Sequence, residues 1–136
     1  MPSEIKLQLR QTAASTSEAS IRGHHVLIDR PTAKGGADLG PMGGELFLAA
    51  IGGCFMSNLL AAIQARDSAI TDVHAEVTGV LLEAPARFSS VELMVTAESA
   101  DRGQLEKLVE IADRGCIMMN TLRGKLDVTV RLGAAV

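Results

Sequence analysis

Two cysteines, Cys54 and Cys116, are the residues of this 136-residue chain with the most distinctive chemistry. A cysteine thiolate can attack a peroxide oxygen and become a sulfenic acid, which a second thiol then converts into a disulfide. Only the thiolate is a good nucleophile, so such a site needs a nearby group that stabilises the negative charge. The two residues therefore suit a peroxidatic and resolving pair, with the alternative that both are small hydrophobes in a core.

One acidic residue, Glu45, precedes Cys54 at the start of a long apolar segment. Its carboxylate could hold an arginine guanidinium in a bidentate pair. Such an arginine would lower the pKa of a neighbouring thiol and orient a peroxide. The alternative is a carboxylate that interacts with the positive N-terminal end of a helix.

The three histidines give no pattern of a metal site. His24 and His25 are adjacent in a predicted strand, so their side chains point to opposite faces. His74 is isolated on a polar strand face, and the spacing of His and Cys does not match a zinc site. A glycine-rich phosphate loop is not found either. We therefore expect no metal and no cofactor.

Composition narrows the class of protein further. Hydrophobic residues make up 47% of the chain and charged residues 21%, which excludes a disordered segment. The chain has three Phe, no Trp and no Tyr, and its net charge is −3. Aromatic stacking and a basic face are therefore lacking, which excludes nucleic acid as a partner. The N-terminus does not resemble a secretory signal, and two cysteines without one indicate the cytoplasm.

The uncharged segment 46–65 is long enough to be considered as a membrane span. It contains several small or polar residues and has no flanking basic or aromatic anchors. Its apolar residues lie on every side of the predicted helix, so the helix must run through the centre of the molecule or of an oligomer. We therefore expect a buried helix and no membrane partner.

Apolar periodicity predicts the elements that must position these residues. Strands are expected over 5–9 and 20–29, a loop over 31–44, a helix over 45–66, a hairpin over 70–82 and 91–97, a helix over 101–116 and a strand over 126–132. Asp101 and Gln104 form an N-cap pair at the start of the second helix, whose periodicity puts Cys116 on its buried face. This order predicts an α+β fold with a mainly antiparallel sheet, in a single domain over 1–136.

Two motifs of the chain resemble the OsmC/Ohr family, the small cysteine-based hydroperoxide reductases. The first is Gly40-Pro41 followed by the run ELFLAAIGGC that ends at Cys54. It is similar to the loop of the family and its central helix with the peroxidatic cysteine. The second is Cys116 with the run NTLRG over 120–124 and the strand 125–132. It is similar to the resolving-cysteine segment and closing strand of the family.

The resemblance implies an OsmC-like fold, with mainly antiparallel sheets around two long helices in an intertwined homodimer. It implies a peroxidase that reduces organic hydroperoxides without a metal and is regenerated by a dithiol such as a lipoyl group. Cys54 would be peroxidatic, Cys116 resolving and Glu45 the carboxylate that holds an arginine. Arg30 is the expected arginine, with Arg22 and Arg10 as alternatives.

The chain departs from the pattern of the family at two places, and in addition no motif fixes the activating arginine. It has Gly43-Gly44-Glu45 where the peroxidase branches have Asn-Pro-Glu, and Ile117 where a proline usually follows the resolving cysteine. These differences favour an alternative function, a non-catalytic OsmC-like protein that binds an apolar small molecule or senses redox state. A structural dimer with two inert core cysteines is a third interpretation.

Overall fold

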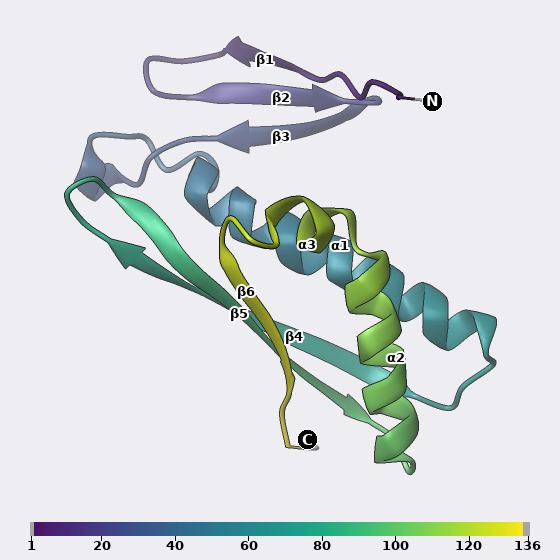
Figure 1. The fold of residues 1–136 in the computed structure, drawn as a ribbon. Coiled ribbons are helices and arrows are strands. Elements are labelled where there is room, and N and C mark those ends of the chain that lie inside the picture. The colour runs from purple at the N-terminus through teal and green to yellow at the C-terminus, as the bar shows by residue number, and fades with distance from the viewer. Residues whose placement is uncertain (1, 135–136) are drawn as a thin grey trace. The chain divides into compact units, whose positions relative to one another are not determined.

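The computed structural model describes residues 2–134. They form two compact units, the first ending at Phe47 and the second beginning at Leu48. The elements in chain order are β1 (Gln8–Gln11), β2 (Ser17–Ile21), β3 (His24–Ile28), the short helix η1 (Thr32–Lys34), α1 (Gly43–Ala65), β4 (Thr71–Leu82), β5 (Arg87–Glu98), α2 (Arg102–Gly115), α3 (Ile117–Leu122) and β6 (Asp127–Leu132). Figure 1 shows the path of the chain. The predicted α+β class is confirmed.

The first unit holds a three-stranded antiparallel sheet in the order β1-β2-β3. The prediction of a single strand over 20–29 is wrong, because the chain reverses at Arg22 and Gly23, both with positive φ. A two-residue hairpin turn needs a positive φ at both of its central residues, and glycine adopts this conformation at position 23 without strain. The first strand also begins later than expected, at Gln8.

The loop between β3 and α1 is tied down by a buried acid, Asp29, of which only 3% is exposed. Its carboxylate accepts hydrogen bonds from the Ser15 hydroxyl at 2.8 Å and the Thr16 hydroxyl at 2.9 Å. It also accepts from the backbone N–H groups of Arg30 at 2.7 Å and Leu39 at 3.2 Å. Burial alone would raise the pKa of Asp29, but these four donors outweigh it and lower the pKa from 3.8 to about 2.

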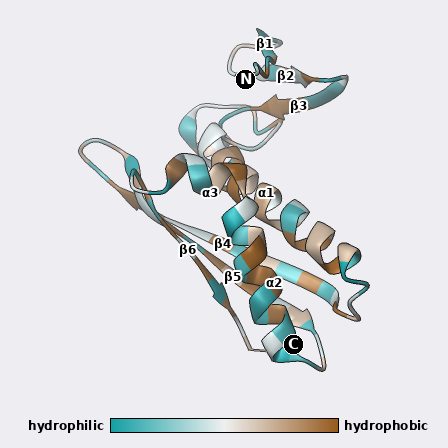
Figure 2. Ribbon diagram, turned by 45° about the vertical axis from the view of Figure 1, so that its right-hand side comes forward, coloured by the Kyte–Doolittle hydropathy of each residue, from teal (hydrophilic) through white to brown (hydrophobic). Residues whose placement is uncertain are grey.

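The second unit is built on a sheet in the order β4-β5-β6. β4 and β5 form the predicted antiparallel hairpin, and β6 pairs with β5 in parallel, so that Val91, Leu93 and Val95 lie opposite Val128, Val130 and Leu132. Residues 48–65 of α1 and the whole of α2 lie on the same side of this sheet (Figures 1 and 2). The inward side chains of β5 and the apolar faces of both helices make the core.

Helix α2 follows the prediction closely at its start. The Asp101 carboxylate accepts a hydrogen bond from the Gln104 N–H at 3.0 Å, as an N-cap does. Its apolar face is buried through Leu105, Leu108, Val109 and Ala112. Cys116 is fully buried as expected, but it lies just beyond the end of α2. The six-residue helix α3 that follows is not predicted by the periodicity.

The apolar helix α1 is less buried in one chain than its composition predicts. Ile51, Gly52, Phe55, Leu59, Ala62 and Ile63 are buried on one face. The opposite face, which includes Gly53, Ser57 and Leu60, is exposed. Figure 2 shows how apolar α1 is along its length. By length and hydropathy α1 is also the one helix of the described residues that could cross a membrane, although core helices of soluble proteins meet the same criteria.

Candidate active site

Cys54 lies in the middle of α1. Gly52, two residues earlier, is a point of close approach between this helix and the sheet. A Cβ atom on Gly52 would lie 2.7 Å from Cγ2 of Val77 in β4, closer than side chains tolerate. Glycine at this position therefore lets α1 approach β4, and Cys54 is left half-buried on the neighbouring part of the helix surface.

The structure brings the two cysteines together. The Cys116 thiol donates a hydrogen bond to the sulfur of Cys54, and the backbone N–H groups of Ile117 and Met118 donate to the same sulfur. Burial raises the pKa of Cys54, but the Met118 N–H, the Cys116 thiol and the Ile117 N–H outweigh it. The net result is a pKa of Cys54 below the ordinary value of a cysteine.

Cys116 has the opposite character. Burial raises its pKa, the Met119 and Met118 N–H groups lower it, and the adjacent Cys54 sulfur raises it further as both acceptor and negative charge. The net result is a pKa of Cys116 above the ordinary value. The first proton therefore leaves Cys54, and the charge rests on the more accessible of the two sulfurs. An accessible thiolate of low pKa suits a nucleophile, and a buried neutral thiol beside it suits the resolving partner.

Glu45 and Arg30 belong to the other compact unit. The Glu45 carboxylate accepts a hydrogen bond from the backbone N–H of Met42 at 2.8 Å, so it caps the first turn of α1. Within the described part of that unit, no ion pair joins Glu45 to Arg30, Arg22 or Arg10. Glu45 thus contacts the backbone at the start of α1, and its pairing with an arginine stays a prediction.

The three candidate arginines have different surroundings. Arg10 pairs with Glu18 at 3.9 Å across β1 and β2, and Arg22 lies in the hairpin turn. Arg30 is exposed and lines an open cavity of about 420 Å³ with Lys34, Asp29 and the N-terminus of α1. The described residues contain no cluster of three metal-ligating side chains.

Sequence reasoning missed the contribution of backbone groups to the site. The N–H groups of Ile117 and Met118 face Cys54 only because the chain turns at Cys116 into α3. In the first unit it also missed the burial of Asp29, which has no signature in hydropathy. A signal for the turn was present in Gly115, which interrupts the helical pattern directly before Cys116.

The chain was compared with known proteins. The family model described as OsmC-like protein matches residues 35–131. A comparison with curated proteins found no match. An OsmC-like protein of Mycoplasma pneumoniae has a similar solved structure, with 17% identity, a TM-score of 0.84 and coverage of 100% of this chain and 99% of that one.

Two other similar structures carry names that state a role. An organic hydroperoxide resistance protein OsmC of Legionella pneumophila has 20% identity and a TM-score of 0.74, covering 98% of this chain and 100% of that one. The organic hydroperoxide resistance protein OhrB of Bacillus subtilis has 24% identity and a TM-score of 0.67, covering 96% and 98%. These structures support the fold, and the family match spans most of the chain. The chain belongs to the OsmC-like family.

Proposed function

We propose that this protein is a thiol-dependent peroxidase that reduces organic hydroperoxides, with Cys54 as the peroxidatic and Cys116 as the resolving cysteine. The observation that carries the proposal is the hydrogen bond from the Cys116 thiol to a Cys54 sulfur of lowered pKa. The names of the Legionella and Bacillus proteins, both of this fold, support the substrate class.

The proposed reaction has three steps. The Cys54 thiolate attacks the distal oxygen of the hydroperoxide, the O–O bond breaks, and the alkoxide leaves and takes a proton to become the alcohol. Cys54 is thereby oxidised to a sulfenic acid. Cys116 then gives up its proton and attacks the Cys54 sulfur, which releases water and forms the disulfide. An external dithiol, for example of the lipoyl type, reduces the disulfide and is itself oxidised.

Arg30 and Glu45 have supporting roles in this proposal. Arg30 is exposed, and the pairing of Arg10 with Glu18 makes Arg10 a weaker candidate. A guanidinium beside the peroxide would stabilise the leaving alkoxide, and Glu45 would hold that guanidinium in place. Glu45 would then exchange its hydrogen bond with the Met42 N–H for the arginine.

The proposal includes a homodimer and a cytoplasmic protein. The exposed face of α1 carries small and apolar residues, among them Leu60 at 49% exposure. A second copy packed on this face would bury it, as the sequence predicts for a helix that is apolar on every side. The low aromatic content of the chain suits a site that admits an alkyl group beside the thiol.

A second candidate is a non-catalytic binder of an apolar small molecule or a redox sensor. It is favoured by Ile117, which replaces the usual proline and is 69% exposed directly after Cys116. It is also favoured by Glu45, whose carboxylate is occupied by a backbone N–H. A binder needs neither rapid oxidation by peroxide nor regeneration by a dithiol.

The test is consumption of cumene hydroperoxide and of hydrogen peroxide in the presence of dihydrolipoamide. We expect the wild type to turn over the organic peroxide faster and Cys54→Ser to be inactive. Cys116→Ser should react once and then stop. Lys107→Ala, at an exposed position of α2, serves as the control and should keep wild-type activity. Equal rates for the wild type and Cys54→Ser would contradict the peroxidase proposal and favour the non-catalytic binder or redox sensor.

A further inference from the structure

The resolving cysteine occupies a corner between two helices. Cys116 is the single residue between α2 and α3, and its backbone is extended, with φ −80° and ψ 121°. Its N–H donates to the carbonyl of Asp113 at 3.3 Å, and its own carbonyl accepts from the Asn120 N–H at 3.0 Å. The direction of the Cys116 side chain is therefore set by the angle at which α3 leaves α2.

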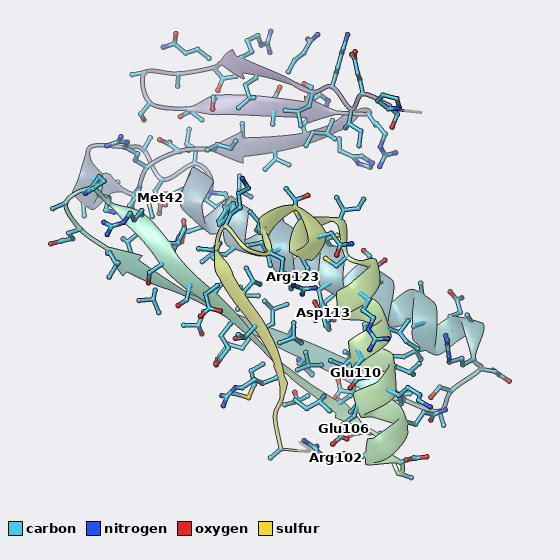
Figure 3. All side chains as sticks on the ribbon, in the orientation of Figure 1. Met42, Arg102, Glu106, Glu110, Asp113 and Arg123 are labelled. Atoms are coloured by element: carbon cyan, nitrogen blue, oxygen red, sulfur yellow. The ribbon has the colours of Figure 1, made fainter. Side chains whose placement is uncertain are left out.

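Two side-chain contacts close this corner from the outside. The Arg123 guanidinium donates to the Asp113 carboxylate, which joins the last turn of α2 to the residue after α3 (Figure 3). The Asn120 side-chain amide donates to the backbone carbonyl of Arg114 at 3.1 Å. Both contacts span Cys116, so each resists opening of the corner.

The Asp113–Arg123 pair differs from the other ion pairs of α2. Glu110 and Arg114 lie on the same helix, at 3.9 Å, with side chains 68% and 78% exposed. Such an exposed pair along one helix contributes little to the stability of the fold. Asp113 and Arg123 are 31% and 49% exposed and come from separate elements, so their contact constrains tertiary geometry.

We infer that Asp113, Asn120 and Arg123 form a positioning clamp that holds Cys116 and the two residues after it against Cys54. The inference deepens the proposed function, because it names residues that position the cysteine pair without touching the peroxide. The three groups that donate to the Cys54 sulfur all come from residues 116–118, inside the clamp.

Loss of the clamp contacts should therefore change the hydrogen bonding of the Cys54 sulfur. If the corner relaxes, the Met118 N–H, the Cys116 thiol and the Ile117 N–H move away from Cys54, while its partial burial remains. The pKa of Cys54 then rises, and less thiolate is present at neutral pH.

The test is the pH dependence of Cys54 alkylation by iodoacetamide in the full chain, with the labelled cysteine assigned by peptide mass spectrometry. We expect Asp113→Ala and Arg123→Ala to shift the midpoint upward and to slow alkylation at pH 7 by about threefold, as a half-unit shift produces. Glu110→Ala removes the same charge from the same helix and should leave the profile unchanged. The reversed pair, Asp113→Arg with Arg123→Asp, should restore part of the wild-type profile.

Two results would overturn the inference: unchanged midpoints in Asp113→Ala and Arg123→Ala, or an equal shift in Glu110→Ala. Circular dichroism of each variant shows whether it is still folded, so that a shifted midpoint in a folded variant can be assigned to loss of the clamp. The assay does not need peroxidase activity. A wild type with a low Cys54 midpoint but no peroxide turnover would end the proposed function and leave the clamp standing.

Discussion

At the scale of single residues, the two cysteines differ in accessibility and in acidity. Cys54 is half-buried with a lowered pKa, and Cys116 is fully buried with a raised one. The sequence identifies both thiols as candidates, but hydropathy and spacing carry no information on hydrogen bonds from backbone N–H groups. The difference in pKa between the two thiols depends on the turn of the chain at Cys116, which the apolar periodicity does not predict.

This asymmetry predicts the order in which the thiols react. Sub-stoichiometric iodoacetamide at pH 7 should label Cys54 well before Cys116, because only a thiolate reacts and the Cys116 sulfur is buried. Peptide mass spectrometry after partial labelling measures the ratio. Labelling after denaturation is the control, since both cysteines should then react alike. Preferential labelling of Cys116 in the native protein would contradict the assigned roles.

Asp29 predicts a pH dependence of stability. Its pKa falls from 3.8 to about 2 on folding, so the ionised carboxylate stabilises the fold above about pH 4. This contribution is lost as the pH falls through the folded pKa. In urea unfolding, Asp29→Asn should be less stable than the wild type at pH 7, and the difference should shrink towards pH 2. Asp38→Asn, an exposed acid of the same loop, should not show this pattern.

At the scale of elements, α2 and the β4–β5 hairpin are predicted because each has one continuous apolar face, and α1 is predicted because it is a long apolar segment with few charges. Periodicity fails at β2 and β3, since the apolar residues Ile21, Val26 and Ile28 continue past a turn that only Gly23 marks. It fails again at α3, which is too short for a helical pattern to repeat. Both failures occur where the chain changes direction within a few residues.

The N-cap of α2 provides a test at this scale. Asp101→Ala removes the acceptor of the Gln104 N–H and should lower the free energy of unfolding by about 1 kcal/mol. Asp101→Asn keeps a good capping side chain and serves as the matched control, with a much smaller change. Urea denaturation measures both variants. Equal losses in the two would show that charge, and not capping, matters at this position.

At the scale of the whole molecule, α1 connects the sequence to the proposed assembly. The sequence predicts a helix buried on every side, and one chain buries only one face of it. A homodimer built on the other face, as proposed, would reconcile the two and would cover the exposed side chain of Leu60. The single-domain organisation over 1–136 stays a prediction, as do the dimer and the cytoplasmic location.

The dimer can be tested through that face. We expect the wild type to have the mass of a dimer by light scattering, and Leu60→Glu to shift it towards the monomer, because a buried unpaired charge is costly at an interface. Lys107→Glu places an acidic residue on the exposed side of α2 and should leave the mass unchanged. A monomeric wild type, or a dimeric Leu60→Glu, would contradict this arrangement.

The central claim is that Cys54 is oxidised first and Cys116 resolves it. The most direct measurement is intact-protein and peptide mass spectrometry after one equivalent of cumene hydroperoxide, with dimedone present to trap sulfenic acid. The account predicts a Cys54–Cys116 disulfide in the wild type, a dimedone adduct on Cys54 in Cys116→Ser, and no adduct on Cys116 in Cys54→Ser. An unoxidised wild type, or an adduct on Cys116 in Cys54→Ser, would contradict it.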